Sequence, residues 1–144
     1  MFSKSCEYAI KAAIFIASKS VENRRVGLKE ITIAIDSPSA FTAKILQKLS
    51  KNSIVNSTKG VYGGFEIPQT KLNAITLIQI VKAVDGNSVF FGCGLGLESC
   101  SEHHPCPVHD EFKEIKEKLI TMLETTTLKD LASGVISGSS FLKY

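Results

Sequence analysis

The chain has 144 residues, of which 44% are hydrophobic and 22% are charged, and its formal net charge is +3. This length is about one domain, or one domain with an added dimerisation element. The longest apolar stretches, such as residues 12–17, are far shorter than the roughly 18 residues of a membrane span, and no signal-peptide cleavage site follows an apolar run near the N-terminus. We therefore expect a cytoplasmic protein with no membrane partner.

Cysteine usage indicates a metal site rather than a disulfide scaffold. Four cysteines are few for a scaffold, and three of them lie within 14 residues. A clustered trio in a reducing compartment favours metal binding. The four residues are Cys6, Cys93, Cys100 and Cys106.

Charge divides unevenly along the chain. Residues 1–72 carry 11 Lys and Arg against 5 Asp and Glu, whereas residues 73–144 carry 6 against 9. A basic half joined to a mildly acidic half is typical of a nucleic-acid-binding module with an oligomerisation or sensing part. Surface lysines that serve solubility are the alternative interpretation.

The basic half begins with two expected helices. Apolar residues recur at three- and four-residue steps from Ser3 to Lys19, which predicts a helix with a small apolar face. A shorter helix is expected from Leu28 to about Asp36. Ser37 followed by Pro38 is a helix start signal, with the serine as cap and the proline at the first helical position.

A third helix follows, and it makes a helix-turn-helix with the second. Its inward positions are Phe41, Ile45, Leu46 and Leu49. Its outward positions contain no carboxylate, so this face can approach a phosphate backbone without repulsion. They include Ser39, Ala40, Thr42, Ala43, Lys44, Gln47, Lys48 and Lys51. An ordinary solvated helix face is the alternative.

A β-hairpin is expected directly after this helix. Residues 54–58 alternate and are β-branched, residues 59–64 form a glycine-rich turn, and residues 65–67 can return as a second strand. This order is that of a winged helix, with Lys59 and Tyr62 at the tip of the wing. A phosphate-binding loop is disfavoured, because no P-loop motif is present and no helix begins after the glycines.

At this point the chain resembles the Rrf2 family of winged-helix transcriptional regulators, of the IscR and NsrR type. The run KILQKLSKNSIVNSTKGVYGGF, residues 44–65, resembles the family's recognition helix, connector and wing. The opening SKSCEYAIKA and the segment ITLIQIVKAVD, residues 75–85, resemble two further family helices. The similarity covers residues 2–135. It implies a homodimer that binds double-stranded DNA at a two-fold related operator.

The acidic half is expected to hold the sensor and the dimer interface. Residues 90–107 lack any period and predict a loop, and a helix of about 17 residues follows from Val108. An apolar stripe on this helix faces a partner helix: Phe112, Ile115, Leu119 and Met122. Packing only within its own chain is the alternative. A capping box at Thr127 predicts a last short helix.

The cysteine loop has the spacing C-x6-C-x5-C-x2-H, which ends at His109. Thiolates are soft ligands for iron–sulfur clusters, zinc or copper(I), and the absence of a closely spaced cysteine pair argues against a structural zinc site. The resemblance implies that Cys93, Cys100 and Cys106 hold a [2Fe–2S] or [4Fe–4S] cluster. This chain has one more residue between Cys93 and Cys100 than the family's usual spacing.

The resemblance also suggests a fourth ligand. In IscR-type members it is a histidine three residues after the last cysteine, which corresponds to His109. In NsrR-type members it is an acidic residue of the first helix, donated by the other subunit, which corresponds to Glu7. His103 and His104 are further candidates, whereas Cys6 is expected to be a small buried residue.

The sequence thus predicts a mostly α (α+β) fold, a winged helix-turn-helix with a long C-terminal dimerisation helix. The expected divisions are the DNA-binding domain (1–86), the sensor loop (87–107), the dimerisation helices (108–136) and a flexible tail (137–144). The predicted DNA contacts are Ser39, Ala40, Phe41, Ala43, Lys44, Lys48, Lys59 and Tyr62.

The predicted function is that of a DNA-binding repressor, switched by a cluster that senses nitric oxide, redox state or iron–sulfur status. The alternative is a metal-free regulator, or one switched by zinc or thiols, controlled by a partner protein or small molecule. An enzyme with Cys106 as nucleophile and His109 as base is disfavoured, because no oxyanion site is evident.

Overall fold

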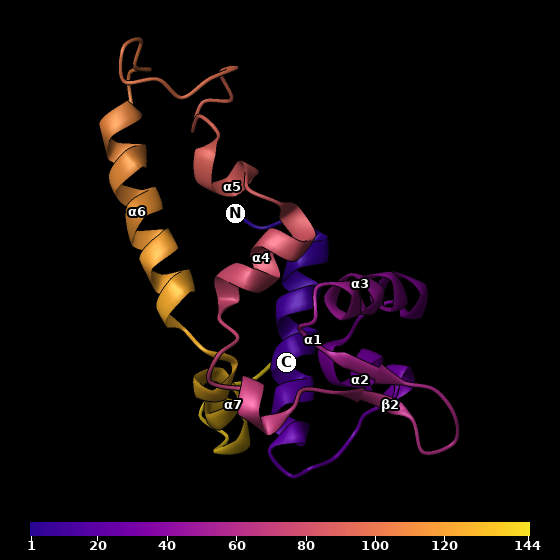
Figure 1. The fold of residues 1–144 in the computed structure, drawn as a ribbon. Coiled ribbons are helices and arrows are strands. Elements are labelled where there is room, and N and C mark those ends of the chain that lie inside the picture. The colour runs from indigo at the N-terminus through magenta and orange to yellow at the C-terminus, as the bar shows by residue number, and fades with distance from the viewer.

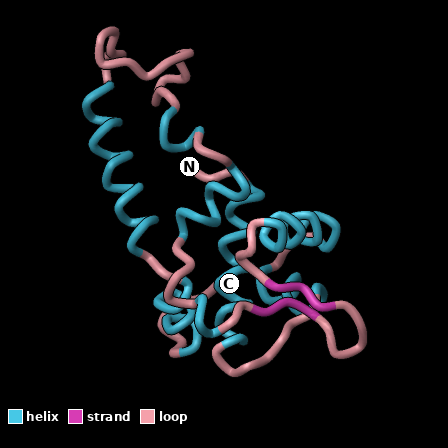
Figure 2. The backbone as a smooth tube through the Cα atoms, in the orientation of Figure 1, coloured by secondary structure: helices cyan, strands magenta, loops and turns pink.

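The structure is a computed structural model that describes all 144 residues, and it is mostly helical with one β-hairpin (Figures 1 and 2). The fold class predicted from the sequence is therefore confirmed. The elements are α1 (Lys4–Ser20), α2 (Leu28–Ile35), α3 (Ser39–Lys51), β1 (Asn56–Thr58), β2 (Gly64–Glu66), the 3-10 helix η1 (Gln69–Lys71), α4 (Leu77–Asp85), α5 (Ser88–Phe91), α6 (His109–Thr125) and α7 (Leu128–Ile136). None of these helices is long and apolar enough to cross a membrane.

Helix α1 is the centre of the molecule, because it packs against α2, α3, α4 and α7. Its buried face consists mostly of small residues, four of them alanine, which lets neighbouring helices approach closely, and Ile16 is fully buried among them. The Ser3 side chain caps the helix by accepting a hydrogen bond from the Cys6 amide at 3.1 Å. Ser3 also donates hydrogen bonds to the carboxylate of Asp85, the last residue of α4.

Helices α2 and α3 form the predicted helix-turn-helix, but the start of α3 differs from the expectation. The helix begins at Ser39 with Pro38 as its cap residue, so Ser37 is not the cap. The Ser37 hydroxyl instead shares a 2.6 Å hydrogen bond with the hydroxyl of Thr42. Thr42 is fully buried, and its expected outward position was wrong. The turn is closed by Asp36 in the left-handed conformation, φ 50°.

The wing is an antiparallel pair of strands with Asn56 opposite Glu66 and Thr58 opposite Gly64. A third segment, which the sequence did not reveal, joins them: Val26 and Phe65 exchange backbone hydrogen bonds of 3.0 and 2.8 Å. The hairpin is thereby tied to the segment that precedes α2. The wing projects from the side of the molecule opposite α6 (Figures 1 and 2).

We divide the chain into the arm, residues 86–125, and the body, which is everything else. The arm runs out through α5, turns through the cysteine loop, and returns along α6 (Figure 1). Helix α4 ends at Asp85 as predicted, but the short helix α5 was not expected, and it buries Phe90. The lower part of α6 packs against α4.

Helix α7 belongs to the body, although the sequence assigned it to a dimerisation unit. It packs against α1 and buries Leu128 and Ala132 completely. The predicted capping box is confirmed, since the Thr127 side chain accepts a hydrogen bond from the amide of Asp130. The segment 137–144, expected to be a flexible tail, folds back so that the Lys143 Nζ donates to the Ile33 carbonyl at 2.8 Å.

Candidate functional site

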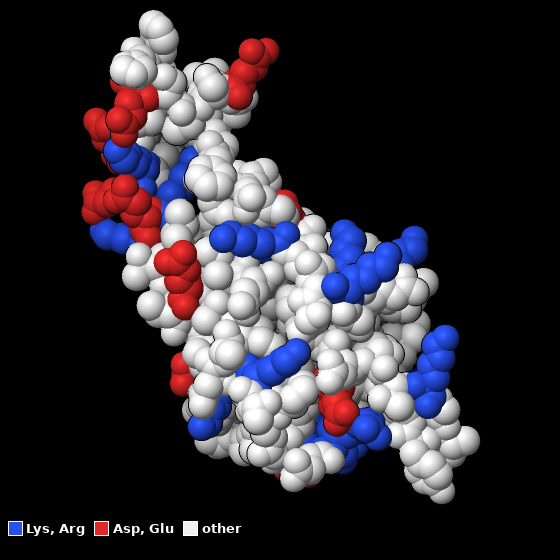
Figure 3. Space-filling model, viewed as in Figure 1, with Lys and Arg blue, Asp and Glu red and all other residues white.

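The outer face of α3 is polar, basic and free of carboxylates. Most of the predicted DNA-contact positions on this helix are exposed, while Ile45, Leu46 and Leu49 anchor its inner face in the core. Lys and Arg side chains gather on the right over α3, whereas Asp and Glu are interspersed with Lys along the arm (Figure 3). The exposed residues are Ser39, Ala40, Lys44, Gln47, Lys48 and Lys51.

Two further positions of α3 are half-buried. Ala43 lines the groove described next. The Phe41 ring, predicted to contact bases, packs edge-on against Tyr8 of α1 with 5.7 Å between the ring centroids. Phe41 thereby connects the start of α3 to α1.

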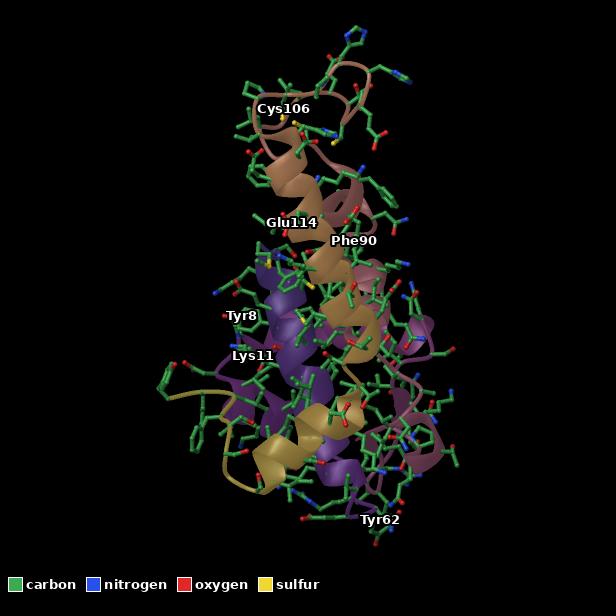
Figure 4. The ribbon with its side chains drawn as sticks, turned by 90° about the vertical axis from the view of Figure 1, so that its left-hand side faces the viewer. Tyr8, Lys11, Tyr62, Phe90, Cys106 and Glu114 are labelled. Atoms are coloured by element: carbon green, nitrogen blue, oxygen red, sulfur yellow. The ribbon has the colours of Figure 1, made fainter.

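A groove of about 600 Å³ lies between α3 and the wing. One wall contains Gln47 and Lys51 from α3, and the other contains Ser57 and Lys59 from the hairpin. Sequence reasoning did not single out Ser57, because a small polar residue on a strand carries no functional pattern by itself. The wing tip continues beyond this groove to Tyr62, which projects from the lower edge of the molecule (Figure 4).

The cysteine loop occupies the far end of the arm, where Cys106 lies in Figure 4. Its candidate ligands come together in two pairs. The Cys100 Sγ lies 3.5 Å from Nδ1 of His109, and the Cys106 thiol is one of the neighbours that lower the pKa of the Cys93 thiol. No group of three or more His, Cys, Asp or Glu residues in the structure is arranged to hold a metal ion.

His109 is the most unusual of these candidate ligands, because it is 91% buried yet only one of its two ring nitrogens has a hydrogen-bond partner. It is the first residue of α6, and its amide donates to the Cys106 carbonyl at 3.0 Å. Its Nε2 is buried without any hydrogen-bond partner. Buried polar atoms are normally paired, so an imidazole with its Nδ1 beside a thiol and its Nε2 without a partner is suited to a ligand position.

The Cys93 sulfur lies among backbone donors. Hydrogen bonds from the amides of Leu95 and Leu97, and a smaller one from Cys106, lower the pKa of the Cys93 thiol from its usual value. Gly94 lies so close to Phe112 that an added Cβ would be 2.5 Å from its ring carbons. The loop therefore favours a thiolate at Cys93 and is fixed against the first turn of α6.

Lysines of α6 hold the loop against the helix. Lys113 forms an ion pair with Glu102, and Lys116 donates a hydrogen bond to the Gly92 carbonyl. Between α5 and α6 there is a cavity of about 260 Å³, lined by Phe90, Cys100, His109 and other residues.

The donor set, three thiols and an imidazole with a free nitrogen, fits an iron–sulfur cluster in its chemistry.

The remaining predicted residues lie outside this arrangement. Glu7 is exposed on α1 and forms an ion pair with Lys4 at 2.8 Å, and His103 and His104 are exposed in the loop. Cys6 is completely buried in the body, as expected. Burial, together with the negative charge of Asp85, raises the pKa of the Cys6 thiol to about 12.

The apolar stripe of α6 is only partly covered within the chain. Phe112 is 37% exposed, Ile115 57% and Met122 43%, while Leu119 is half-buried. Leu123 and His109, the buried residues of this helix, lie on the face that borders the stripe.

Comparison with known proteins identifies the relatives of this chain. The family model described as "Rrf2: Iron-dependent Transcriptional regulator" matches residues 2–134. A putative HTH-type transcriptional regulator of Aquifex aeolicus is 32% identical over 133 residues, which cover 91% of this chain and 90% of the relative. The HTH-type transcriptional regulator IscR of Pectobacterium atrosepticum is 26% identical, with coverage of 88% and 75%.

Solved structures share the fold. The cysteine regulator CymR of B. subtilis superposes with a TM-score of 0.77 at 23% identity, covering 92% of this chain and 96% of that one. IscR of T. potens superposes with a TM-score of 0.73 at 16% identity, with coverage of 97% and 91%.

Proposed function

The chain belongs to the Rrf2 family of transcriptional regulators, and from this premise we propose that it is a dimeric repressor whose DNA affinity is set by an iron–sulfur cluster. It is a regulator and not an enzyme. The proposed operator is double-stranded and two-fold related, because a symmetric dimer presents two identical recognition helices. The proposed signals are nitric oxide, redox state or iron–sulfur status.

DNA binding through α3 and the wing is supported by the carboxylate-free outer face of α3 and by the groove that it shares with the hairpin. Lysines there would neutralise phosphates, and Lys44 is the best candidate to reach a guanine edge. Lys59 would enter or flank the minor groove. The proposed contact set is Ser39, Ala40, Phe41, Ala43, Lys44, Lys48, Lys59 and Tyr62.

The cluster proposal is carried by one observation, the buried imidazole of His109 at the start of α6, whose Nδ1 lies beside the Cys100 thiol and whose Nε2 has no partner. Cys93, Cys100, Cys106 and His109 would hold the cluster, with Glu7 of the other subunit as the reserve for the fourth position. Iron–thiolate bonds would supply sensitivity to nitric oxide and oxidants. Since His109 begins α6, the ligand set is joined directly to the helix that bears the apolar stripe.

The proposed dimer interface is this stripe, Phe112, Ile115, Leu119 and Met122. An exposed apolar row at heptad-like spacing on a helix too short for an independent coiled coil is suited to a two-fold mate. Changing the spacing of the two recognition helices needs to alter DNA binding by only a few kcal/mol to switch the operator, since about 1.4 kcal/mol is tenfold.

The cluster is tested by the visible spectrum and by the iron and sulfide content of protein purified without oxygen. We expect a brown protein that absorbs at about 400 nm, and we expect this absorbance to be lost in Cys93→Ala and in His109→Ala. Cys6→Ala is the matched control, because it removes a thiol outside the loop. A colourless wild type, with no iron after reconstitution, would refute the cluster and leave the DNA-binding proposal standing.

DNA binding is tested on duplexes selected from a random pool by the wild-type dimer. Lys59→Ala should weaken binding and reduce the slope of log K against log salt by about one, because one phosphate contact is lost. Lys129→Ala, an exposed lysine of α7, should change neither quantity. An unchanged slope in Lys59→Ala would remove the wing lysine from the interface.

A thiol-switched regulator without metal is the second candidate. It is favoured by the lowered pKa of the Cys93 thiol, to which the neighbouring Cys106 contributes. Oxidation of the two thiols to a disulfide would also remodel the loop. A colourless protein whose DNA affinity changes on treatment with diamide, and is restored by dithiothreitol, would select this candidate.

A further inference from the structure

The wing tip exposes two hydrophobic side chains almost completely. Val61 is 94% exposed and Tyr62 is 90% exposed, and neither packs against the body. Tyr62 extends away from the rest of the molecule at its lower edge (Figure 4). Single exposed apolar residues are common, but an adjacent aromatic and aliphatic pair at the end of a projecting hairpin is suited to a contact surface.

The backbone of the tip holds these side chains outward. The strands end at the pair Thr58 and Gly64, so five residues form the turn, closed by a 3.0 Å hydrogen bond from the Gly63 amide to the Gly60 carbonyl. A Cβ atom at Gly63 would collide with the carbonyl of Thr58. The close approach of the two ends of the turn therefore requires glycine, and the tip is a compact loop rather than an extended one.

The charge around the tip indicates which partner it meets. No Asp or Glu occurs from Lys51 to Phe65, while Lys59 lies two residues before Val61. The tip also continues the groove between α3 and the hairpin. An apolar pair behind a cation, and beside a carboxylate-free recognition helix, is complementary to the floor and the phosphate rims of a DNA minor groove.

We propose that Val61 and Tyr62 form an apolar wedge that enters the minor groove beside the major-groove site of α3 and partly unstacks a base step there. The proposal rests on the proposed DNA-binding function and goes beyond it by assigning a source of sequence preference. Apolar wedges from loops and strands kink DNA in this way, at a cost that depends on the step deformed.

The base preference follows from groove chemistry. A·T pairs present only acceptors in the minor groove, whereas a G·C pair adds the guanine N2 amino group, which would obstruct an apolar side chain. The wedge therefore favours A·T-rich or flexible pyrimidine–purine steps under the wing. Inosine·cytosine pairs lack that amino group but keep the major-groove edge of G·C.

The test uses the full-length dimer and a duplex selected from a random pool, with the wing position mapped by hydroxyl-radical footprinting. We expect Tyr62→Ala to weaken binding about tenfold and Tyr62→Phe to remain within about twofold of wild type, because the ring and not the hydroxyl makes the contact. Phe141→Ala, another highly exposed aromatic residue, is the matched control and should bind like wild type.

Substituted duplexes supply the second readout. G·C pairs under the wing should weaken wild-type binding, inosine·cytosine pairs should restore it, and Tyr62→Ala should no longer distinguish the two. The fluorescence of a 2-aminopurine placed at the step under the wing should increase when wild type binds and unstacks it, and should not increase with Tyr62→Ala.

The outcomes separate the two proposals. If wild type binds but Tyr62→Ala binds equally well, or Tyr62→Phe is as weak as Tyr62→Ala, the wedge is refuted and the regulator stands. The wedge would also be refuted if G·C pairs and inosine·cytosine pairs under the wing weakened wild-type binding equally. If wild type binds no duplex, the DNA-binding function itself fails.

Discussion

Leu46 and Leu95 are residues of one type, yet Leu46 is fully buried in the body and Leu95 is 55% exposed in the arm. The same contrast holds throughout the molecule, since only three of its 31 buried residues, Phe90, His109 and Leu123, belong to the arm. The body therefore has its own hydrophobic core. The position of the arm depends instead on a few lysine contacts and on packing against α4. Its exposed apolar side chains are left for a partner to cover.

This contrast shows how stability and responsiveness can be separated within one chain. Local opening is easiest where few apolar contacts are buried, and the arm is the part of the chain that fits this description. A ligand or a second subunit that orders the arm can therefore move the arm without disturbing the hydrophobic core that supports α3. The following predictions test that separation, beginning with the largest expected effect.

Thiol reactivity should differ most between the two regions. In the cluster-free protein, Cys93 should be alkylated by iodoacetamide readily near neutral pH, because backbone hydrogen bonds lower its pKa. Cys6, with a pKa of about 12 instead of 9.0, should have about 1000-fold less thiolate than an ordinary thiol, and its burial slows the reaction further. Peptide mass mapping over time measures both rates; comparable rates would contradict the contrast.

Leucine truncation should follow as the next largest effect. Leu46→Ala is expected to lower the free energy of unfolding by about 3 kcal/mol, because it opens a cavity in a packed core. Leu95→Ala should change it by less than about 0.5 kcal/mol, since the side chain is already largely in solvent. Urea unfolding followed by circular dichroism compares the two variants. A large decrease in the free energy of unfolding of Leu95→Ala would mean that the arm has a hydrophobic core of its own.

Disruption of the α6 stripe should affect association and not folding. Ile115→Glu is expected to weaken the dimer about 30-fold, because a carboxylate would be buried between two copies of the helix. Thr121→Glu adds the same charge on an exposed position of the same helix and away from the stripe, so it is the control. Sedimentation velocity measures both dimer affinities. A fully dimeric Ile115→Glu would exclude the stripe as the interface.

Alkaline pH should weaken the body gradually. The folded pKa of Cys6 is above its unfolded value, so its contribution to stability is present below about pH 9 and is lost as pH rises toward about 12. Denaturation midpoints measured from pH 8 to 10.5 should fall more steeply in wild type than in Cys6→Ala. Identical slopes would show that the buried thiol has no part in this loss.

Much of the body was predictable because its helices are periodic. The apolar spacing located α1, α2 and α3, the glycine-rich run located the wing, and the family resemblance located α4. In the arm, apolar spacing located α6. The bridge between Val26 and Phe65 was not predicted, because backbone pairing across 39 residues has no local pattern. The cap at Ser37 was misjudged because its hydroxyl has a competing partner, Thr42, that helix propensity alone does not identify.

The candidate site was predictable as a set of residues but not as an arrangement. Cysteine spacing indicated which side chains belong to the loop, yet it could not show that Cys100 pairs with His109 or that Cys93 receives amide hydrogen bonds. A loop without periodicity contains no directional information, so its geometry depends on long-range contacts such as that between Lys113 and Glu102.

The packing of α7 against α1 also determines when the molecule can become complete during its synthesis. Helix α4 and the arm lie between two segments that are joined by backbone hydrogen bonds, from the Leu77 amide to the Thr126 carbonyl and from the Leu128 amide to the Ile75 carbonyl. The N-terminal helix must therefore wait for almost the entire chain to leave the ribosome before its last partner arrives. The nascent cysteine loop emerges earlier, while the surface of α1 that α7 will cover is still open.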